Sequence, residues 1–189
     1  MNRRSLILVS TVASVLILCS ATGSHAQKIA DCGQQVGGIR LCLVFVGPGD
    51  LEVALQNVSD RDLTLNLGII LGNGRAQLPN YISLNFTDAH GKTRLFKFTN
   101  KRYPGVAGRI DDYVVPLRAG STYALHLTLD QFWCQETNEF SIPLLPGKNQ
   151  LTAEFEGNGA KASNLDTPGI KLMNFWRGKV ESNTLTLEH

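Results

Sequence analysis

Few residues of this chain have the type and spacing that catalysis requires. Cys134 and His126, eight residues apart, are the one pair that could supply a nucleophile and a general base. A thiolate activated by an imidazole is a common nucleophilic arrangement. No local motif of a cysteine-dependent enzyme surrounds either residue, so a structural cysteine and a surface histidine are the stronger interpretation. We therefore expect no catalytic residue and no enzyme activity, and a cysteine-dependent enzyme is the least favoured class.

Paired carboxylates are the second arrangement that could do chemistry. Glu154 and Glu156 would share one face of a strand, and glycoside hydrolysis uses two carboxylates about 5–9 Å apart. Their alternation with Ala153 and Phe155 instead predicts the solvent-facing side of an ordinary strand. The acidic turn at residues 60–62 lacks the spaced ligand series of a calcium site, and the histidines lack metal-ligand spacing. We expect neither a metal site nor a cofactor.

A basic segment is the most distinctive charge feature. No acid occurs between Asp88 and Asp111, and this interval holds Lys92, Arg94, Lys97, Lys101, Arg102 and Arg109. We expect Lys92 and Arg94 to share a strand face and the later basic residues to gather near a loop. Binding of an anionic partner or a glycan is the functional interpretation, and a solvated strand and loop is the simpler one. The candidate binding residues are Lys97, Lys101, Arg102, Tyr103 and Arg109.

Two further residue types bear on recognition. Asn57 and Asn85 begin N-x-S/T sequons at positions that look exposed, and both could be glycosylated if the host modifies exported proteins. Trp133 and Trp176 could stack on sugars, although a tryptophan in a β-sandwich more often packs in the core.

The N-terminus has the layout of a secretory signal peptide covering residues 1–26. Arg3 and Arg4 precede an apolar run at residues 6–18, and a polar stretch ends in small residues at 24 and 26. The run is too short for a membrane span of about 20 residues, and no later segment is apolar for long enough. We expect residues 27–189 to act outside the cytoplasm, in a periplasm or the extracellular space.

The charge balance of residues 27–189 is neutral. All 16 acidic residues lie after residue 26, whereas two of the 18 basic residues are Arg3 and Arg4. A neutral chain lacks the cationic face that general binding to nucleic acid requires, so we expect no nucleic-acid partner. The expected partner is a protein or a glycan.

Three cysteines follow the predicted signal peptide, and three cannot all pair within one chain. We favour a disulfide between Cys32 and Cys42, which would close a short local loop, although the sequence leaves the other pairings open. Cys134 is then expected to be a small buried residue, the alternative being a thiol available to a partner.

The elements that would position these residues are almost all strands. Residues 38–46 form a nearly continuous apolar run, typical of a strand buried on both faces. Alternating segments separated by turn signals occupy residues 51–57, 62–67, 81–87, 92–99, 112–117, 121–129, 139–144, 149–156 and 182–188.

The alternation predicts pairings as well as strands. We expect residues 51–57 to form a hairpin with 62–67, and residues 81–87 to form one with 92–99. In residues 121–129, four side chains should face inward: Tyr123, Leu125, Leu127 and Leu129. We expect a helical turn at residues 130–136, capped by Asp130, and a surface loop at 157–169.

The segments 51–67, 116–123, 144–151 and 176–183 resemble immunoglobulin-like modules of secreted proteins, over residues 51–187. The resemblance implies one all-β domain, residues 27–189, built as an immunoglobulin-like sandwich of about 7–10 short antiparallel strands. Its implied role is a non-enzymatic binding or structural module that recognises its partner through loops. Some proteinase inhibitors share this scaffold, so inhibition through residues 101–109 is the alternative.

Overall fold

The strands of the protein hold nearly all of its regular structure. The computed structural model describes residues 32–188 except 73, 100–107 and 161–167, so the predicted signal peptide lies outside the described residues. The strands are β1 (Ile39–Gly47), β2 (Asp50–Asn57), β3 (Leu63–Leu71), β4 (Ala76–Leu78), β5 (Ile82–Thr87), β6 (Thr93–Phe98), β7 (Ile110–Leu117), β8 (Thr122–Thr128), β9 (Phe132–Cys134), β10 (Glu139–Phe140), β11 (Lys148–Gly157) and β12 (Gly178–Glu188). Two 3-10 turns are η1 (Leu129–Gln131) and η2 (Pro168–Leu172).

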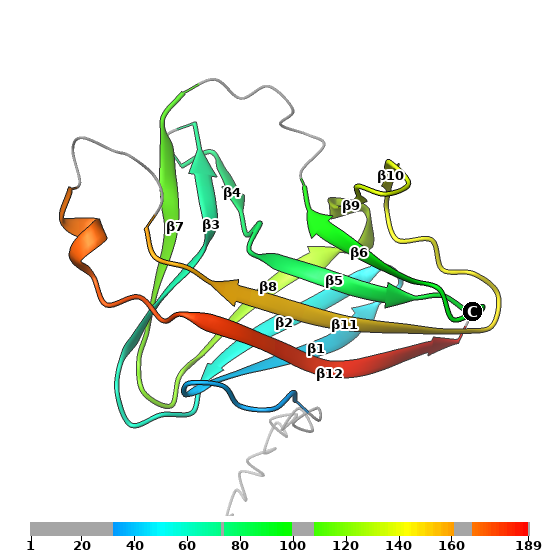
Figure 1. The fold of residues 1–189 in the computed structure, drawn as a ribbon, viewed down its shortest axis with the longest axis horizontal. Coiled ribbons are helices and arrows are strands. Elements are labelled where there is room, and N and C mark those ends of the chain that lie inside the picture. Colours follow the sequence, from blue (N-terminus) through cyan, green and yellow to red (C-terminus); the bar gives the residue numbers. More distant parts are fainter. Residues whose placement is uncertain (1–31, 73, 100–107, 161–167, 189) are drawn as a thin grey trace, which may run out of the picture.

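These strands form three antiparallel sheets. Their strand orders are β1-β2-β8, β10-β9-β6-β5-β11-β12 and β4-β3-β7. In Figure 1 the six-stranded sheet runs across the front, the β1-β2-β8 sheet lies behind it, and β3, β4 and β7 stand upright at one side. The all-β class and the antiparallel arrangement are confirmed, and the layers are consistent with a β-sandwich. The immunoglobulin-like identity of that sandwich stays a prediction.

The predicted hairpin between residues 51–57 and 62–67 is wrong. β2 pairs with β1 and β8, whereas β3 pairs with β4 and β7 in another sheet. The chain changes sheets at Asn57, whose Nδ2 donates hydrogen bonds to the carbonyls of Arg61 (2.8 Å) and Leu117 (3.0 Å). Alternation predicts that a segment is a strand, but it does not specify the partner of that strand.

Other predicted elements agree more closely with the structure. β5 and β6 form the predicted second hairpin, and Leu127 and Leu129 are buried with Tyr123 and Leu125 packed against the core. The helical turn occurs earlier and is shorter than predicted, because residues 132–134 continue as strand β9. Its N-cap is Thr128, whose N–H donates to Oε1 of Gln131 (2.9 Å).

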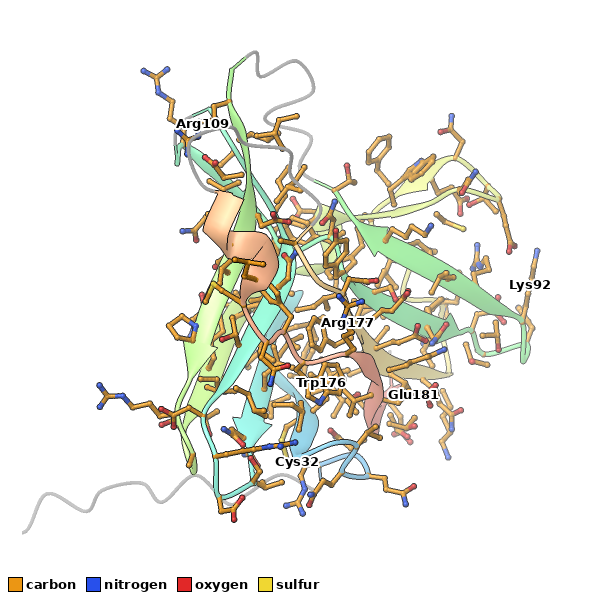
Figure 2. The ribbon with its side chains drawn as sticks, turned by 60° about the vertical axis from the view of Figure 1, so that its left-hand side comes forward. Cys32, Lys92, Arg109, Trp176, Arg177 and Glu181 are labelled. Carbon is orange, nitrogen blue, oxygen red and sulfur yellow. A yellow bond between two sulfur atoms is a disulfide. The ribbon has the colours of Figure 1, made fainter. Side chains whose placement is uncertain are left out.

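One hydrophobic core joins side chains from all three sheets. Its largest fully buried aromatic residues are Phe86, Phe96, Phe132 and Phe155. Trp176 stacks on Phe155 with ring centroids 5.5 Å apart, and Figure 2 shows it in the interior. A Cβ on Gly157 would collide with the Trp176 ring, so only glycine fits beneath it.

A disulfide and a side-chain bridge close the N-terminal end of the fold. Cys32 and Cys42 form the predicted disulfide. The Asn183 side chain then ties β12 to β1, accepting from the N–H of Leu43 (2.9 Å) and donating to its carbonyl (3.0 Å). No helix in the described ranges is both long and apolar enough to cross a bilayer.

Candidate functional site

The basic residues of this segment that the structure describes do not form one patch. Arg94 was expected on the exposed face beside Lys92, but its side chain points into the protein and is 9% exposed. It pairs with Asp88 (3.5 Å) and Glu139 (3.1 Å), and its guanidinium lies 5.8 Å from the centre of the Phe86 ring. Because its side chain is buried and its charge faces two acids, Arg94 offers little charge to a ligand.

The remaining basic residues are separated in space. Lys92 and Arg109 lie at opposite extremities of the molecule in Figure 2. Arg109 forms an ion pair with Asp111 (2.8 Å), so its charge is largely compensated. Lys101, Arg102 and Tyr103 lie outside the described residues.

Lys97 is the predicted binding residue that lies at a concave surface. Leu95, Lys97, Gln135 and Glu136 line a cavity of about 410 Å³, which we call the Lys97 hollow. Lys97 is exposed on β6, between the buried residues Phe96 and Phe98. No ion-pair partner of Lys97 occurs within the described part of the chain.

The hollow lies on the outer face of the six-stranded sheet. Trp133 of β9 lies opposite Lys97, and Phe140 of β10 lies opposite Trp133. The two aromatic rings are tilted by 38° with centroids 6.4 Å apart. Phe140 is 43% exposed, so an aromatic surface borders the hollow.

The orientation of Trp133 is fixed by the following turn. Its indole N–H donates to Oδ1 of Asn138 at 3.1 Å. Asn138 has φ 56°, a left-handed conformation that asparagine tolerates better than most residues. The sequence favours a core position for Trp133 over sugar stacking, whereas the structure places it partly buried beside Lys97. The alternation of Phe132 and Cys134 around Trp133 is the signal that could have shown its outward orientation.

Polar side chains continue from the hollow across the sheet. Through successive cross-strand pairs, one row contains Phe140, Trp133, Lys97, Ser83, Glu154 and Glu181. A parallel row contains Leu95, Asn85, Thr152 and Thr184. The face is therefore apolar and aromatic at β9 and β10, rich in hydroxyl and amide groups at β5, and charged at β12.

Glu154 and Glu156, the two glutamates paired in the sequence, lie opposite Glu181 and Lys179 of β12. Lys179 binds Glu154 at 2.8 Å and lies 3.8 Å from Glu181. The hydrogen bond and the charge of Glu154 raise the pKa of Lys179. Glu154 is thus paired with a cation and 15% exposed, while Ala153 and Phe155 point inward as predicted.

Cys134 and His126 do not come together. Cys134 is fully buried in the core, whereas the His126 side chain is 74% exposed and lies 3.8 Å from Glu52. Burial alone would raise the pKa of the Cys134 thiol, but hydrogen bonds from the Thr137 hydroxyl and the N–H groups of Thr137 and Glu136 lower it below 9.0. The structure therefore buries the proposed nucleophile and exposes its proposed base.

The two sequon asparagines, Asn57 and Asn85, are less exposed than the sequence predicts. Asn57 is 1% exposed and its amide nitrogen is committed to two carbonyls, so the folded protein cannot present it for glycosylation. Asn85 is half-buried on the outer face of β5 and donates a long hydrogen bond to Glu154 (3.4 Å). Trp176 is in the core, as expected for tryptophan in such a fold.

The described residues contain no group of three or more histidine, cysteine or acidic side chains arranged to hold a metal ion. Comparison with known proteins adds no family to this description: no model of a known protein family matches the chain, and a search of curated proteins finds no significant match.

Proposed function

We propose that the chain is an exported, non-enzymatic binding module on an immunoglobulin-like sandwich, which recognises a protein or a glycan through the surface around the Lys97 hollow. The observation that supports this proposal is the exposed ammonium group of Lys97, which has no ion-pair partner among the described residues, beside the Trp133–Phe140 pair. Concave surfaces with an aromatic border and a few polar groups are the usual form of binding sites.

The contrast with the other basic residues supports Lys97 in particular. Arg94 is buried between two acids, and Arg109 is paired with Asp111. Lys97 keeps its charge available to a ligand and lies on a strand, where its position is held by the sheet. Rigid elements position binding groups more accurately than loops do.

The Cys32–Cys42 disulfide supports the exported location. Disulfides persist in oxidising compartments such as the periplasm and the extracellular space. The neutral charge of residues 27–189 fits recognition of a specific surface better than general binding to polyanions.

The test is a pull-down with immobilised residues 27–189 and the extracytoplasmic fraction of the host. Lys97→Glu should reduce the specifically retained species at least several-fold, because it places a negative charge where the ligand meets a cation. Lys92→Glu is the matched control, since Lys92 is also exposed, precedes β6 and does not line the hollow.

A further variant examines the adjoining basic residues. Charge reversal at Lys101 and Arg102 together should also weaken retention if they extend the binding surface. Equal retention by wild type, Lys97→Glu and Lys92→Glu would contradict a binding role for the hollow.

A further inference from the structure

We infer that the outer face of the six-stranded sheet, from the Trp133–Phe140 pair through the Lys97 hollow to Thr152, binds a neutral saccharide chain. The inference rests on the proposed binding function and names the chemical class of its ligand. It follows from three features of this face: an ordered aromatic platform, a mixed polar border, and a polar extension across the sheet.

The aromatic platform is the first feature. Trp133 and Phe140 are cross-strand neighbours, so the sheet holds their rings at a fixed separation of 6.4 Å between centroids. The bond from the indole N–H to Asn138 restricts rotation of the Trp133 ring. The negative face of an aromatic ring attracts the polarised C–H groups on one side of a pyranose. A platform that is already ordered loses little conformational entropy when a sugar stacks on it.

The polar border of the hollow supplies the second feature. Lys97 donates hydrogen bonds, Glu136 accepts them, and the amide of Gln135 does both. A sugar hydroxyl is itself both a donor and an acceptor, so it can use all three groups. The cation and the anion in one hollow also oppose each other, which disfavours a strongly charged ligand.

The extension of the face across the sheet is the third feature. Ser83, Asn85 and Thr152 follow the hollow in cross-strand register. The five strands from β10 to β11, spaced by about 4.8 Å, give this face a span of roughly 19 Å, enough for an extended chain of several sugars. At its far end Lys179 compensates one of the two charges of Glu154 and Glu181, and the remaining negative charge disfavours a polyanion.

A protein partner fits this face less well. The core of a protein–protein interface is apolar and central, with a polar rim around it. Here Trp133, Phe140 and Leu95 lie at one end, and the middle of the face is polar. An aromatic platform at one end of the face, followed by hydroxyl and amide groups, suits a saccharide chain. Its first sugar would stack on the aromatic rings, and the following sugars would form hydrogen bonds.

The experiment measures binding to defined saccharides. Residues 27–189 are run through native gels that contain hydroxyethyl cellulose, arabinoxylan or alginate, and are applied to an array of immobilised neutral oligosaccharides. We expect retardation by at least one neutral chain and none by alginate, which is a uronic-acid polymer. Titration with the bound neutral chain should also change tryptophan fluorescence, because Trp133 lies in the site and Trp176 in the core.

Variants assign the binding to this face. Trp133→Ala should weaken binding at least tenfold, Gln135→Ala should weaken it several-fold, and Trp133→Tyr should restore most of it. Phe45→Ala is the matched control, because Phe45 is a 36% exposed aromatic residue on β1 of another sheet. Each variant is compared by circular dichroism, so that loss of folding is distinguished from loss of binding.

The outcomes separate this inference from the proposed function. Binding of a neutral chain that depends on Trp133 supports both. Binding of alginate alone overturns the neutral class of ligand. If no saccharide binds while a protein is retained in a manner sensitive to Lys97→Glu, the saccharide inference is wrong and the binding function stands. If neither occurs, both are wrong.

Discussion

Asp88 holds the turn between β5 and β6 through three partners. Hydrogen bonds from the N–H of Lys92 (3.0 Å) and of His90 (2.9 Å), together with the charge of Arg94, lower its pKa below 3.8, although partial burial acts in the opposite direction. The unfolded chain therefore binds a proton more readily than the folded protein does. The stability that Asp88 contributes is present above its unfolded pKa and is lost as pH falls through its lower folded value.

This difference gives the first prediction. Asp88→Asn should lower the urea midpoint at pH 7 and should flatten the loss of stability as pH falls below about 4, relative to wild type. Asparagine can still accept the two N–H groups but no longer attracts Arg94. Asp60→Asn, in an exposed turn, is the control. A pH dependence as steep in Asp88→Asn as in wild type would contradict this role.

Cys134 gives the second prediction at the level of single residues. In residues 27–189 without reductant, a thiol reagent should find one free thiol, since Cys32 and Cys42 are paired. That thiol should react only after addition of guanidinium chloride, because Cys134 is 0% exposed. Fast reaction of the native protein would show that the β9–β10 region opens, and two or more free thiols would contradict the disulfide.

Sequence reasoning succeeded for single residues where the local pattern decides the outcome. The Cys32–Cys42 pair is close in sequence, and Ala153 and Phe155 point inward as their alternation with Glu154 predicts. It failed for Arg94, whose burial depends on acids contributed by a turn and by β10. It failed for Asn57 because a sequon does not reveal that its amide is committed to a distant carbonyl.

At the scale of elements, the contact between β12 and β1, which we call the seam, differs from an ordinary strand pairing. No ladder joins the two strands there, and the Asn183 side chain takes the place of a backbone partner for Leu43. A register irregularity between β11 and β12 lies at the same position, opposite residues 182 and 183. An extra residue in a strand redirects side chains, which explains how Asn183 reaches β1.

The third prediction concerns this seam. Asn183→Ala removes the donor and the acceptor together and should reduce the free energy of unfolding by about 1–3 kcal/mol, since it leaves partly buried backbone groups unpaired. Hydrogen exchange at the Leu43 amide should accelerate as well. Thr184→Ala, at the neighbouring exposed position, should leave that amide protected. Unchanged exchange at Leu43 in Asn183→Ala would contradict the bridge.

The elements also show which features of the fold the alternation of the sequence cannot predict. Alternation identified most strands and the β5–β6 hairpin, whose turn is short and local. It could not show that β2 and β3 join different sheets, because that choice depends on the Asn57 side chain and on strands distant in sequence. The Lys97 hollow likewise needs β6 and β9 to meet, although about 35 residues separate Lys97 from its partner Trp133.

At the scale of the whole molecule, one core joins the three sheets, so the sequence expectation of a single domain over residues 27–189 becomes testable. The fluorescence of Trp133 reports on the outer face of the six-stranded sheet. The fluorescence of Trp176 reports on the core, where the Trp176 ring stacks on Phe155 and its indole N–H donates to the carbonyl of Gly37 (3.1 Å). These two probes lie in different parts of the fold. A single cooperative unit must lose both environments together.

The fourth prediction follows from this arrangement. Trp133→Phe leaves only Trp176 as a fluorescent probe, and Trp176→Phe leaves only Trp133. In each variant, the urea midpoint measured by fluorescence should equal the urea midpoint measured by far-UV circular dichroism. Reduction of Cys32–Cys42 should shift both midpoints together, by a loss of about 2–3 kcal/mol in the free energy of unfolding. Separate midpoints within one variant would instead divide the chain into two folding units. The site around Lys97 would then have to be assigned to the unit that contains Trp133, and its stability would be independent of the disulfide.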